Sequence, residues 1–486
     1  MPSICLRRLL PSMLLATLLT SPPLTAHADT TRYFNVNGYT LVSPPGNDAE
    51  LKSFSSFVVR DGRFIAVGGE HLAEAYAEAT AVDLQQQTVL PGLIDAHGHV
   101  MGLGMRLSQV DLRDSESAAA AVNQLVQFAQ QHPQQSWLQG GGWNQENWPD
   151  KRFPTAAMID EQIADRPVWL MRVDAHAGWA NQAALDAAGI DASSIDPDGG
   201  EIVRDQHGNP TGVLIDNAMN LVKRVIPEPT VAEQQQALQL AFQRLLSLGI
   251  TSTHDAGVSA EQIALYQRLA ANQQLPLRIY AMIAATEPRL PELLAQGPIT
   301  SADDKFQLNS VKIYADGALG SRGAALLEPY SDAPHQHGLL VTPVEDIATL
   351  FNLILPYGFQ INIHAIGDRA NRIALDQFAR SFAEIGGKNL RNRVEHAQIV
   401  NKSDLKRFKS LNIIASMQPT HATSDKNMAE DRLGKARMAG AYAWQTLLQQ
   451  GTIVAAGSDF PVEPANPSRR RYPPRSTRST CRGLVC

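Results

Sequence analysis

Two histidines separated by a single residue, His97 and His99, follow an apolar segment that starts at Pro91. Residues i and i+2 of a strand face the same side, so both imidazoles can bind one cation. Asp95 lies two residues earlier on that face, where it either fixes the tautomer of an imidazole or only accepts backbone hydrogen bonds. A His-x-His pair alone is weak evidence, but this pair ends a run typical of a buried strand. The pattern therefore favours a site for a divalent cation.

Polar residues also end other apolar runs farther along the chain. They are His254, Asp255, Lys312, Asp316, His364, His396 and Asp459. Histidines at the ends of several buried strands are hard to explain by packing alone. In a parallel barrel the carboxyl ends of the strands meet at one mouth, which would bring these distant side chains together.

The elements that must position these residues alternate regularly. Strand-like runs are separated by stretches with apolar residues at helical spacing, such as 232–248 and 370–385. Eight runs begin near Pro91, Ile250, Leu277, Val311, Gln360, Arg393, Ile413 and Ile453. Such alternation predicts an α/β protein with a parallel sheet, and eight strands with polar ends predict a (β/α)8 TIM barrel.

Two regions fall outside this alternation. Residues 29–90 contain short alternating segments around Asp61-Gly62, which is typical of hairpins and predicts the N-terminal part of a small accessory β-sandwich domain. The segment from about 102 to 220 is too long for a loop and predicts a subdomain inserted after the first barrel strand, including the strand-like run at Val168. The barrel would then span residues 91–467.

The composition narrows the class of protein. Of 486 residues, 44% are hydrophobic and 19% are charged, which is ordinary for a globular protein and excludes global disorder. The formal net charge of -6 is small and argues against nucleic acid as a partner. We expect a small-molecule substrate, and association into a homo-oligomer stays open. The three cysteines are Cys5, Cys481 and Cys486, which argues against a thiolate zinc site or a cysteine nucleophile.

The first 28 residues have the pattern of a secretory signal peptide. Arg7 and Arg8 precede a mostly apolar run from Leu9 to Leu19, and Ala26-His-Ala28 reads as a cleavage site. We expect cleavage after Ala28 and a mature protein that is periplasmic or secreted and not bound to a membrane. An uncleaved anchor is the alternative, but the apolar run is short for a bilayer.

Several motifs together resemble one known family. The segment Pro91-Gly-Leu-Ile-Asp-Ala-His-Gly-His99 is similar to the opening motif of the amidohydrolase superfamily. Further similar segments begin at Gly249 (GITSTHDAG), Val311 (VKIYADGALGSR), Asn362 (NIHAIGDRAN), Val394 (VEHA), Met417 (MQP) and Gly457 (GSDFPV). In this order they resemble the YtcJ-like branch, amidohydrolase family 3, which includes N-substituted formamide deformylases. The resemblance extends from about Val58 to Asn466.

The resemblance implies a ligand for each of several strand ends. His97 and His99 would be the first metal ligands, His364 and His396 would follow at the fifth and sixth strands, and Asp459 would be the carboxylate of the eighth. Imidazole and carboxylate together suit Zn²⁺, as one or two ions. The metal would activate water and polarise a carbonyl, and Asp459 would act as the general base.

Lys312 has two interpretations. An ammonium group has no lone pair for a metal, but in related amidohydrolases a lysine at a comparable strand end is N-carboxylated and bridges two metals. The same resemblance makes a carboxylated Lys312 and a binuclear site plausible here. Alternatively, Lys312 stays an ammonium and pairs with Asp316 or with an anionic substrate.

Residues for binding the substrate are less sharply indicated. The segments around Trp143 and His176 resemble family regions near the pocket, although each tryptophan could equally pack in a core. Arg322 could bind a carboxylate or an oxyanion, or form a structural ion pair. His421 and Asp425 could line the mouth or cap a helix.

The resemblance stops after Asn466-Pro467. Residues 468–486 are rich in arginine and proline and have no apolar period, so we expect a divergent, disordered tail. A shifted reading frame explains this tail more simply than a basic peptide that binds nucleic acid or membrane. Loss of the strands and helix that related chains carry would weaken the barrel near Asp459.

The expected activity is hydrolysis of a non-peptide C–N bond, of the amide or N-formyl type, by metal-activated water. A deaminase on the same scaffold and an inactive, truncated binding protein are the alternatives, because the scaffold alone does not fix the reaction. Release of ammonia or of a carboxylate would separate the two enzymes, and metal analysis would separate both from the binding protein.

Overall fold

The computed structural model describes residues 30–42, 50–173, 176–467 and 484–485. It divides the chain into two units, residues 1–91 and 92–486, which are taken separately below. The expected signal peptide and its cleavage site lie outside the described residues, as does the tail apart from Leu484 and Val485. No helix in the described part of the chain has the length and apolar character that a bilayer span requires.

The first unit is a five-stranded sheet. Its elements are β1 (Thr30–Val42), β2 (Glu50–Arg60), β3 (Arg63–Gly68), α1 (Leu72–Ala75), β4 (Thr80–Asp83) and β5 (Thr88–Val89). The strand order is β3-β2-β1-β4, and β5 also pairs with β1. Asp61 and Gly62, both with positive φ, connect β2 to β3 as an antiparallel hairpin, as the Asp-Gly signal predicts. Val36, Phe57 and Val58 form its buried core.

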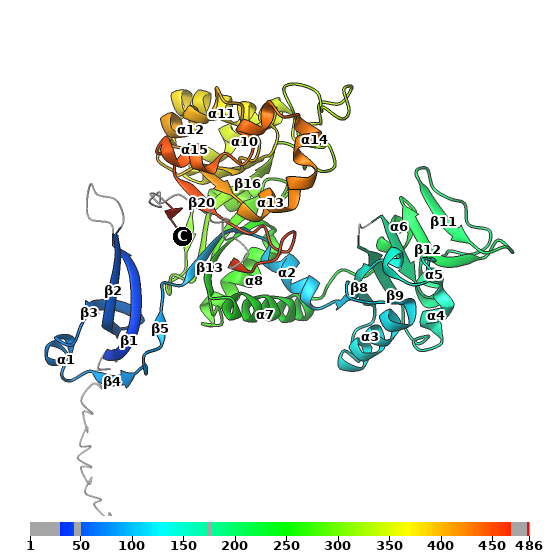
Figure 1. The fold of residues 1–486 in the computed structure, drawn as a ribbon, viewed down its shortest axis with the longest axis horizontal. Coiled ribbons are helices and arrows are strands. Elements are labelled where there is room, and N and C mark those ends of the chain that lie inside the picture. Colours follow the sequence, from blue (N-terminus) through cyan, green and yellow to red (C-terminus); the bar gives the residue numbers. More distant parts are fainter. Residues whose placement is uncertain (1–29, 43–49, 174–175, 468–483, 486) are drawn as a thin grey trace, which may run out of the picture. The chain divides into compact units, whose positions relative to one another are not determined.

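The second unit is built on parallel strands that hydrogen-bond in the order of the sequence (Figure 1). These strands are β6 (Leu93–Gly98), β13 (Ile250–Val258), β14 (Arg278–Ala284), β16 (Phe306–Tyr314), β17 (Gln360–Ala365), β18 (Arg393–His396), β19 (Ile414–Met417) and β20 (Val454–Ala456). All eight predicted runs are present. A parallel bridge between Gly98 and Phe460 links the last strand region to the first, so the sheet is a nearly closed, TIM-barrel-like structure.

Gly98 allows this closure. A Cβ added at Gly98 would lie 2.3 Å from the ring of Phe460, which is fully buried. The residue between the two histidines must therefore be small, because an aromatic ring occupies the space where a side chain would project.

Helices follow most of the barrel strands and cover them with apolar residues. They are α7 (Val231–Ser247), α8 (Ala260–Ala271), α9 (Leu290–Ala295), α10 (Val344–Ile354), α11 (Asp368–Glu384), α12 (Leu405–Leu411) and α15 (Trp444–Gln449). The predicted helical stretches 232–248 and 370–385 correspond to α7 and α11. Thr230 and Glu233 form a capping box at the start of α7, and Ser259 and Gln262 form another at α8. Local capping thus fixes where these helices begin.

Shorter elements complete the barrel. They are α2 (Val100–Leu107), β15 (Ile299–Thr300), α13 (Pro419–Ser424), α14 (Ala429–Leu433) and β21 (Leu484–Val485). The two-residue strand β21 pairs with β20, in the part of the tail that the sequence predicts to be disordered.

The predicted insertion is a six-stranded mixed sheet with helices packed on it (Figure 1). Its elements are β7 (Val110–Asp111), α3 (Ala118–Gln131), β8 (Leu138–Trp143), α4 (Ala156–Asp160), β9 (Val168–Arg172), β10 (Ala177–Ala180), α5 (Gln182–Ala188), β11 (Gly200–Arg204), β12 (Pro210–Asp216) and α6 (Met219–Lys223). The run at Val168 is β9, inside the insertion as predicted. Trp143, Trp148 and Trp179 pack together in its core with ring centroids 6.0 and 6.2 Å from that of Trp143.

The insertion core yields a test of stability. Trp143 is fully buried and its indole donates a 2.8 Å hydrogen bond to the Leu170 carbonyl oxygen. We expect Trp143→Ala to lower the free energy of unfolding by about 3–5 kcal/mol, because it leaves a cavity and an unpaired carbonyl. Urea denaturation followed by circular dichroism measures this change. Ile195→Ala is the matched control, since Ile195 is 88% exposed; equal stability of the two variants would contradict the packing described here.

Candidate metal centre

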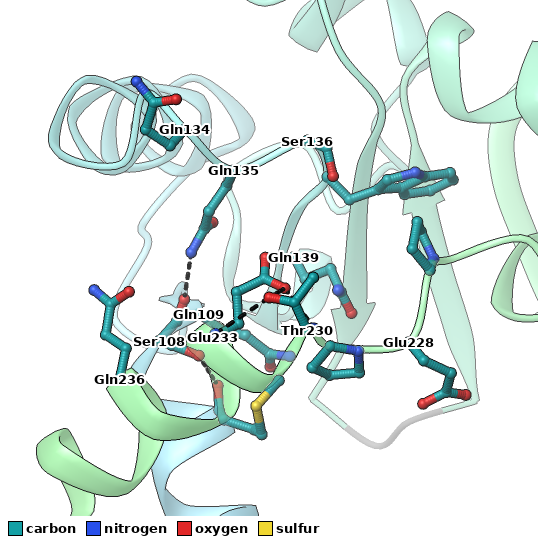
Figure 2. Close-up of a pocket in the computed structure, with 14 residues that line it drawn as sticks. Ser108, Gln109, Gln134, Gln135, Ser136, Gln139, Glu228, Thr230, Glu233 and Gln236 are labelled. Atoms are coloured by element: carbon teal, nitrogen blue, oxygen red, sulfur yellow. Dashed lines mark hydrogen bonds between the residues drawn. The ribbon is translucent and has the colours of Figure 1, made fainter.

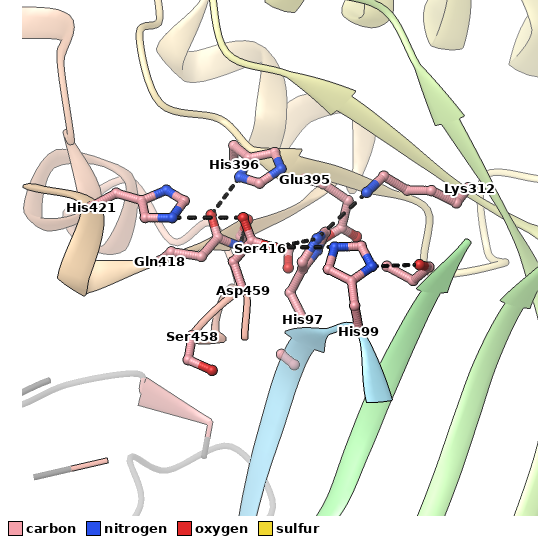
Figure 3. A network of polar contacts seen from close by, with 12 residues as sticks. His97, His99, Lys312, Glu395, His396, Ser416, Gln418, His421, Ser458 and Asp459 are labelled. Carbon is pink, nitrogen blue, oxygen red and sulfur yellow. Dashed lines mark hydrogen bonds and ion pairs between the residues drawn. The ribbon is translucent and has the colours of Figure 1, made fainter. Parts of the chain in front are cut away.

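Seven ionisable side chains meet at the carboxyl ends of the barrel strands (Figure 3). They are His97 on β6, His99 just after it, Lys312 on β16, Glu395 and His396 on β18, His421 on α13 and Asp459 after β20. His97 and Asp459 are 362 positions apart in the sequence. They are in contact because the parallel strands end at one rim of the barrel.

The first group of potential ligands is His97, His99 and Asp459. The Oδ1 atom of Asp459 lies 3.6 Å from Nε2 of His97 and 3.2 Å from Nε2 of His99. Around a tetrahedral cation with bonds of about 2.1 Å, two ligand atoms are about 3.4 Å apart. Both distances match the spacing of neighbouring ligands, and all three ligand atoms lie within 4.8 Å of one another. The predicted His-x-His pair and the carboxylate of the eighth strand come together.

Each of three histidines is held with its Nε2 atom available. Nδ1 of His97 lies 2.5 Å from Oε2 of Glu395, and Nδ1 of His99 lies 2.9 Å from the Ala256 carbonyl oxygen. Nδ1 of His396 lies 2.8 Å from the side-chain oxygen of Gln418. Each partner atom only accepts hydrogen bonds, so each Nδ1 carries the proton and each Nε2 keeps a lone pair. This is the donor arrangement that a divalent cation requires.

The second group is His396, His421 and Asp459. Nε2 of His421 lies 3.6 Å from Oδ2 of Asp459 and is a buried nitrogen with no hydrogen-bond partner. Its ring is parallel to that of His396, with centroids 5.8 Å apart. The carboxylate of Asp459 thus has one oxygen beside each group. The sequence is compatible with two roles for His421, lining the mouth of the barrel or capping a helix. In the structure its side chain lies at the mouth.

His364 lies beside this second group but not within it. Its ring centroid is 4.5 Å from that of His396, while its buried Nε2 has no hydrogen-bond partner and lies 3.4 Å from Oδ1 of Asp316. Asp316 accepts hydrogen bonds from the backbone N–H groups of Ala325, Ile366 and Gly367. The role of His364 as a ligand stays a prediction.

Lys312 reaches the first group from β16. It is 1% exposed, its Nζ atom is 3.4 Å from Nε2 of His97, and it lies over the ring of Tyr314. Burial lowers the pKa of the Lys312 ammonium to about 8, although the charges of Glu395 and Asp459 act in the opposite direction. Among the described residues no ion pair joins Lys312 to Asp316, so that part of the alternative interpretation is not formed. Pairing of an ammonium Lys312 with an anionic substrate stays a prediction.

Asp459 stays ionised in this environment. Burial alone would raise its pKa, but its contacts with the imidazoles of His99, His97 and His421 lower the pKa below the usual value. Its backbone has a φ of 62°, and His396 and Ala397 have φ values of 73° and 41°. These non-glycine residues adopt the left-handed region where the chain turns out of β18 and β20, a conformation with an energetic cost.

Other polar strand ends have structural partners instead. Asp95 accepts hydrogen bonds from the backbone N–H groups of His97 and Ser458 and from the Ser458 hydroxyl. Asp255 accepts from the Val100 N–H group and the Tyr266 hydroxyl. Nδ1 of His254 accepts from the Arg393 guanidinium. The carboxylate that fixes the His97 tautomer is Glu395, which the sequence does not single out.

The three predicted substrate-binding residues lie elsewhere. Trp143 is in the core of the insertion with no exposed surface, which is the packing alternative and offers a substrate no contact in this structure. The His176 side chain is 75% exposed and lies 2.7 Å from Asp216. Arg322 pairs with Asp332 at 2.9 Å, which is the structural alternative. Asp425 accepts from Gln398 and Tyr442.

A cavity of about 420 Å³ lies away from these histidines (Figure 2). It is lined by glutamines, including Gln109, Gln135 and Gln139, and by residues at the start of α7. Its lining contains none of the potential metal ligands.

Comparison with known proteins agrees with the geometry at the rim. A model of the amidohydrolase family matches residues 80–472. This chain belongs to that family. It is 34% identical over 420 residues to the putative amidohydrolase YtcJ of Bacillus subtilis, covering 84% of this chain and 78% of that protein. It is 26% identical over 438 residues to the N-substituted formamide deformylase of Arthrobacter pascens, covering 87% of this chain and 80% of that protein.

A solved structure is also similar to this chain. An uncharacterized metal-dependent hydrolase from Pyrococcus furiosus matches with a TM-score of 0.74 and 29% identity, over 91% of this chain and 87% of that one. The resemblance to YtcJ-like members of amidohydrolase family 3 that the motifs indicate is therefore confirmed.

The two groups predict how single substitutions change metal content. His97→Ala should remove the cation of the first group, since it deletes one of three closely spaced donors. His421→Ala and His364→Ala test which imidazole is a ligand in the second group. If only one of these two variants loses metal, the histidine replaced in that variant is the ligand. Elemental analysis of the purified folded proteins measures this, with His207→Ala in the exposed loop after β11 as control. Full metal content in His97→Ala would contradict the site.

Proposed function

We propose that this family member is a hydrolase that cleaves a non-peptide C–N bond, of the amide or N-formyl type, with water. The observation that carries the proposal is the convergence of the Nε2 atoms of His97 and His99 on one oxygen of Asp459. Membership of the amidohydrolase family and the similarity to a metal-dependent hydrolase support a hydrolase. The similarity to a formamide deformylase favours an N-formyl or N-acyl substrate.

The donor set fits a borderline divalent cation, for which we propose Zn²⁺ as one or two ions. Imidazole nitrogens with free lone pairs and one shared carboxylate are ligands that Zn²⁺ prefers, and buried nitrogens without partners at His421 and His364 are otherwise costly. A bound cation of this kind supplies Lewis-acid polarisation of a carbonyl and a nucleophile at neutral pH.

Asp459 is the proposed general base. Its lowered pKa keeps the carboxylate ionised near neutral pH, so it can accept a proton from the attacking water. The same carboxyl group then donates that proton to the leaving nitrogen, which leaves as a neutral amine. The buried position of Asp459 limits competition from bulk water for this proton.

Lys312 is proposed to act in its N-carboxylated form. The neutral amine adds to CO2 and loses a proton, which gives a carbamate with two oxygens that can serve as ligands. A pKa of about 8 leaves a useful fraction of the amine neutral near pH 7.5. The position of Nζ, 3.4 Å from Nε2 of His97, would place a carbamate beside the first group of ligands.

We further propose that the protein works outside the cytoplasm. The support is the pattern in residues 1–28, with cleavage after Ala28 to give a periplasmic or secreted form. The partner would be a small-molecule substrate.

Replacement of Asp459 tests the reaction. The protein, stripped with a chelator and reloaded with Zn²⁺ or Mn²⁺, is screened against N-acyl and N-formyl compounds, and formate, carboxylate and ammonia are measured separately. We expect Asp459→Asn to lower kcat by about 10²–10⁴-fold, because the amide cannot accept the proton. His207→Ala should keep full activity. Ammonia as the first product would indicate a deaminase, and undiminished turnover in Asp459→Asn would exclude its role as base.

A further inference from the structure

Glu395 lies directly behind the first metal-binding histidine (Figure 3). Its Oε2 atom is 2.5 Å from Nδ1 of His97, and neither side chain has any exposed surface. Of the three imidazoles whose Nδ1 partners are described above, only that of His97 has a carboxylate as the Nδ1 partner. His99 has a carbonyl oxygen as its acceptor and His396 an amide oxygen. A full negative charge behind Nδ1 makes the opposite nitrogen a stronger donor than a neutral acceptor does.

Arg393 holds this carboxylate on both oxygens. Its Nε donates to Oε1 of Glu395 at 2.6 Å, and its Nη2 donates to Oε2 at 2.9 Å. Together with His97, three groups therefore hydrogen-bond to the Glu395 carboxylate. The geometry is the bidentate pairing that guanidinium and carboxylate form most favourably.

Arg393 is fixed in turn by neighbouring strands. Its Nη2 also donates to the Ala96 carbonyl oxygen and to the Ser416 hydroxyl, both at 2.6 Å, and its Nη1 donates to His254. The guanidinium therefore contacts β6, β13, β18 and β19 beneath the rim. Glu395 cannot move relative to His97 without breaking several of these contacts.

The buried ion pair between Glu395 and Arg393 is poorly explained by a contribution to stability alone. A buried ion pair recovers little more than the cost of taking its charges out of water, and an apolar pair of similar volume often serves the fold as well. What an apolar pair cannot do is accept the Nδ1 proton of His97. His97 is therefore the residue of this network that requires Glu395 to be a carboxylate.

We propose that Glu395, held by Arg393, is the positioning residue of His97. It fixes the tautomer with the proton on Nδ1 and strengthens Nε2 as a donor, and so it sets the affinity for the cation at His97, His99 and Asp459. This inference rests on the proposed metal centre, and it adds a residue outside the ligand set that the family resemblance implies.

Cobalt binding tests this role without relying on turnover. The full-length protein is freed of metal and titrated with Co²⁺ in competition with a chelating dye, and the visible spectrum is recorded. Glu395→Gln keeps an oxygen acceptor for His97 but removes the charge. We expect its affinity for Co²⁺ to fall by about 10–100-fold, with a changed visible absorption. Asp255→Asn is the matched control, since Asp255 is a buried carboxylate on the neighbouring strand β13 that bonds Val100 and Tyr266, and it should bind Co²⁺ as the wild type does.

A second variant keeps the test decisive if Glu395→Gln alone fails to fold. Glu395→Gln alone leaves Arg393 as an uncompensated buried charge, whereas Glu395→Gln combined with Arg393→Gln removes both charges. The double variant should also bind Co²⁺ more weakly than the wild type. If either folded variant binds Co²⁺ with wild-type affinity and spectrum while only its free energy of unfolding falls, Glu395 is structural and the inference is overturned. Failure of the wild type to bind Co²⁺ would instead refute the proposed metal centre, and this inference with it.

Discussion

A cluster of imidazoles can bind a cation only if each ring presents a lone pair, and this requirement explains much of the structure around the rim. Three rings in the cluster donate a hydrogen bond from Nδ1 to an acceptor on a different element: a glutamate on β18, a backbone carbonyl on β13 and a glutamine after β19. The parallel strands fix these acceptors as firmly as the histidines themselves. Asp459, whose two oxygens face different groups of donors, joins the end of the barrel to its beginning.

The contact that closes the barrel therefore also assembles the metal centre. The bridge from Gly98 to Phe460 brings the eighth strand beside the first, and Asp459 is the residue just before that bridge. Asp95 reinforces the junction, because its carboxylate binds the backbone of both Ser458 and His97. A chain that failed to close would still contain every histidine but would lack the oxygen on which they converge.

The sequence predicted the strands and the polar residues at their ends, because a buried parallel strand has a long apolar run with a sharp polar end. It also located the insertion, since no loop of that length is expected. It did not predict Glu395 as the partner of His97, because contacts between strands depend on register, which no local pattern encodes. His421 lies on a short helix after β19 and has no periodic signal. Trp143 and Arg322 were named from motifs, but Trp143 packs in an aromatic core and Arg322 pairs with Asp332, and the motifs encode neither contact.

The left-handed backbone at His396 and Asp459 limits which residues evolution or an engineer can place there. Histidine, asparagine and aspartate enter this conformation more readily than other side chains, and branched ones hardly at all. At these two positions, the need for a metal ligand and the left-handed backbone conformation thus favour the same few residue types. Conversion of this rim to a different chemistry would meet no backbone constraint of this kind at His97 and His99, which are not among the residues with positive φ.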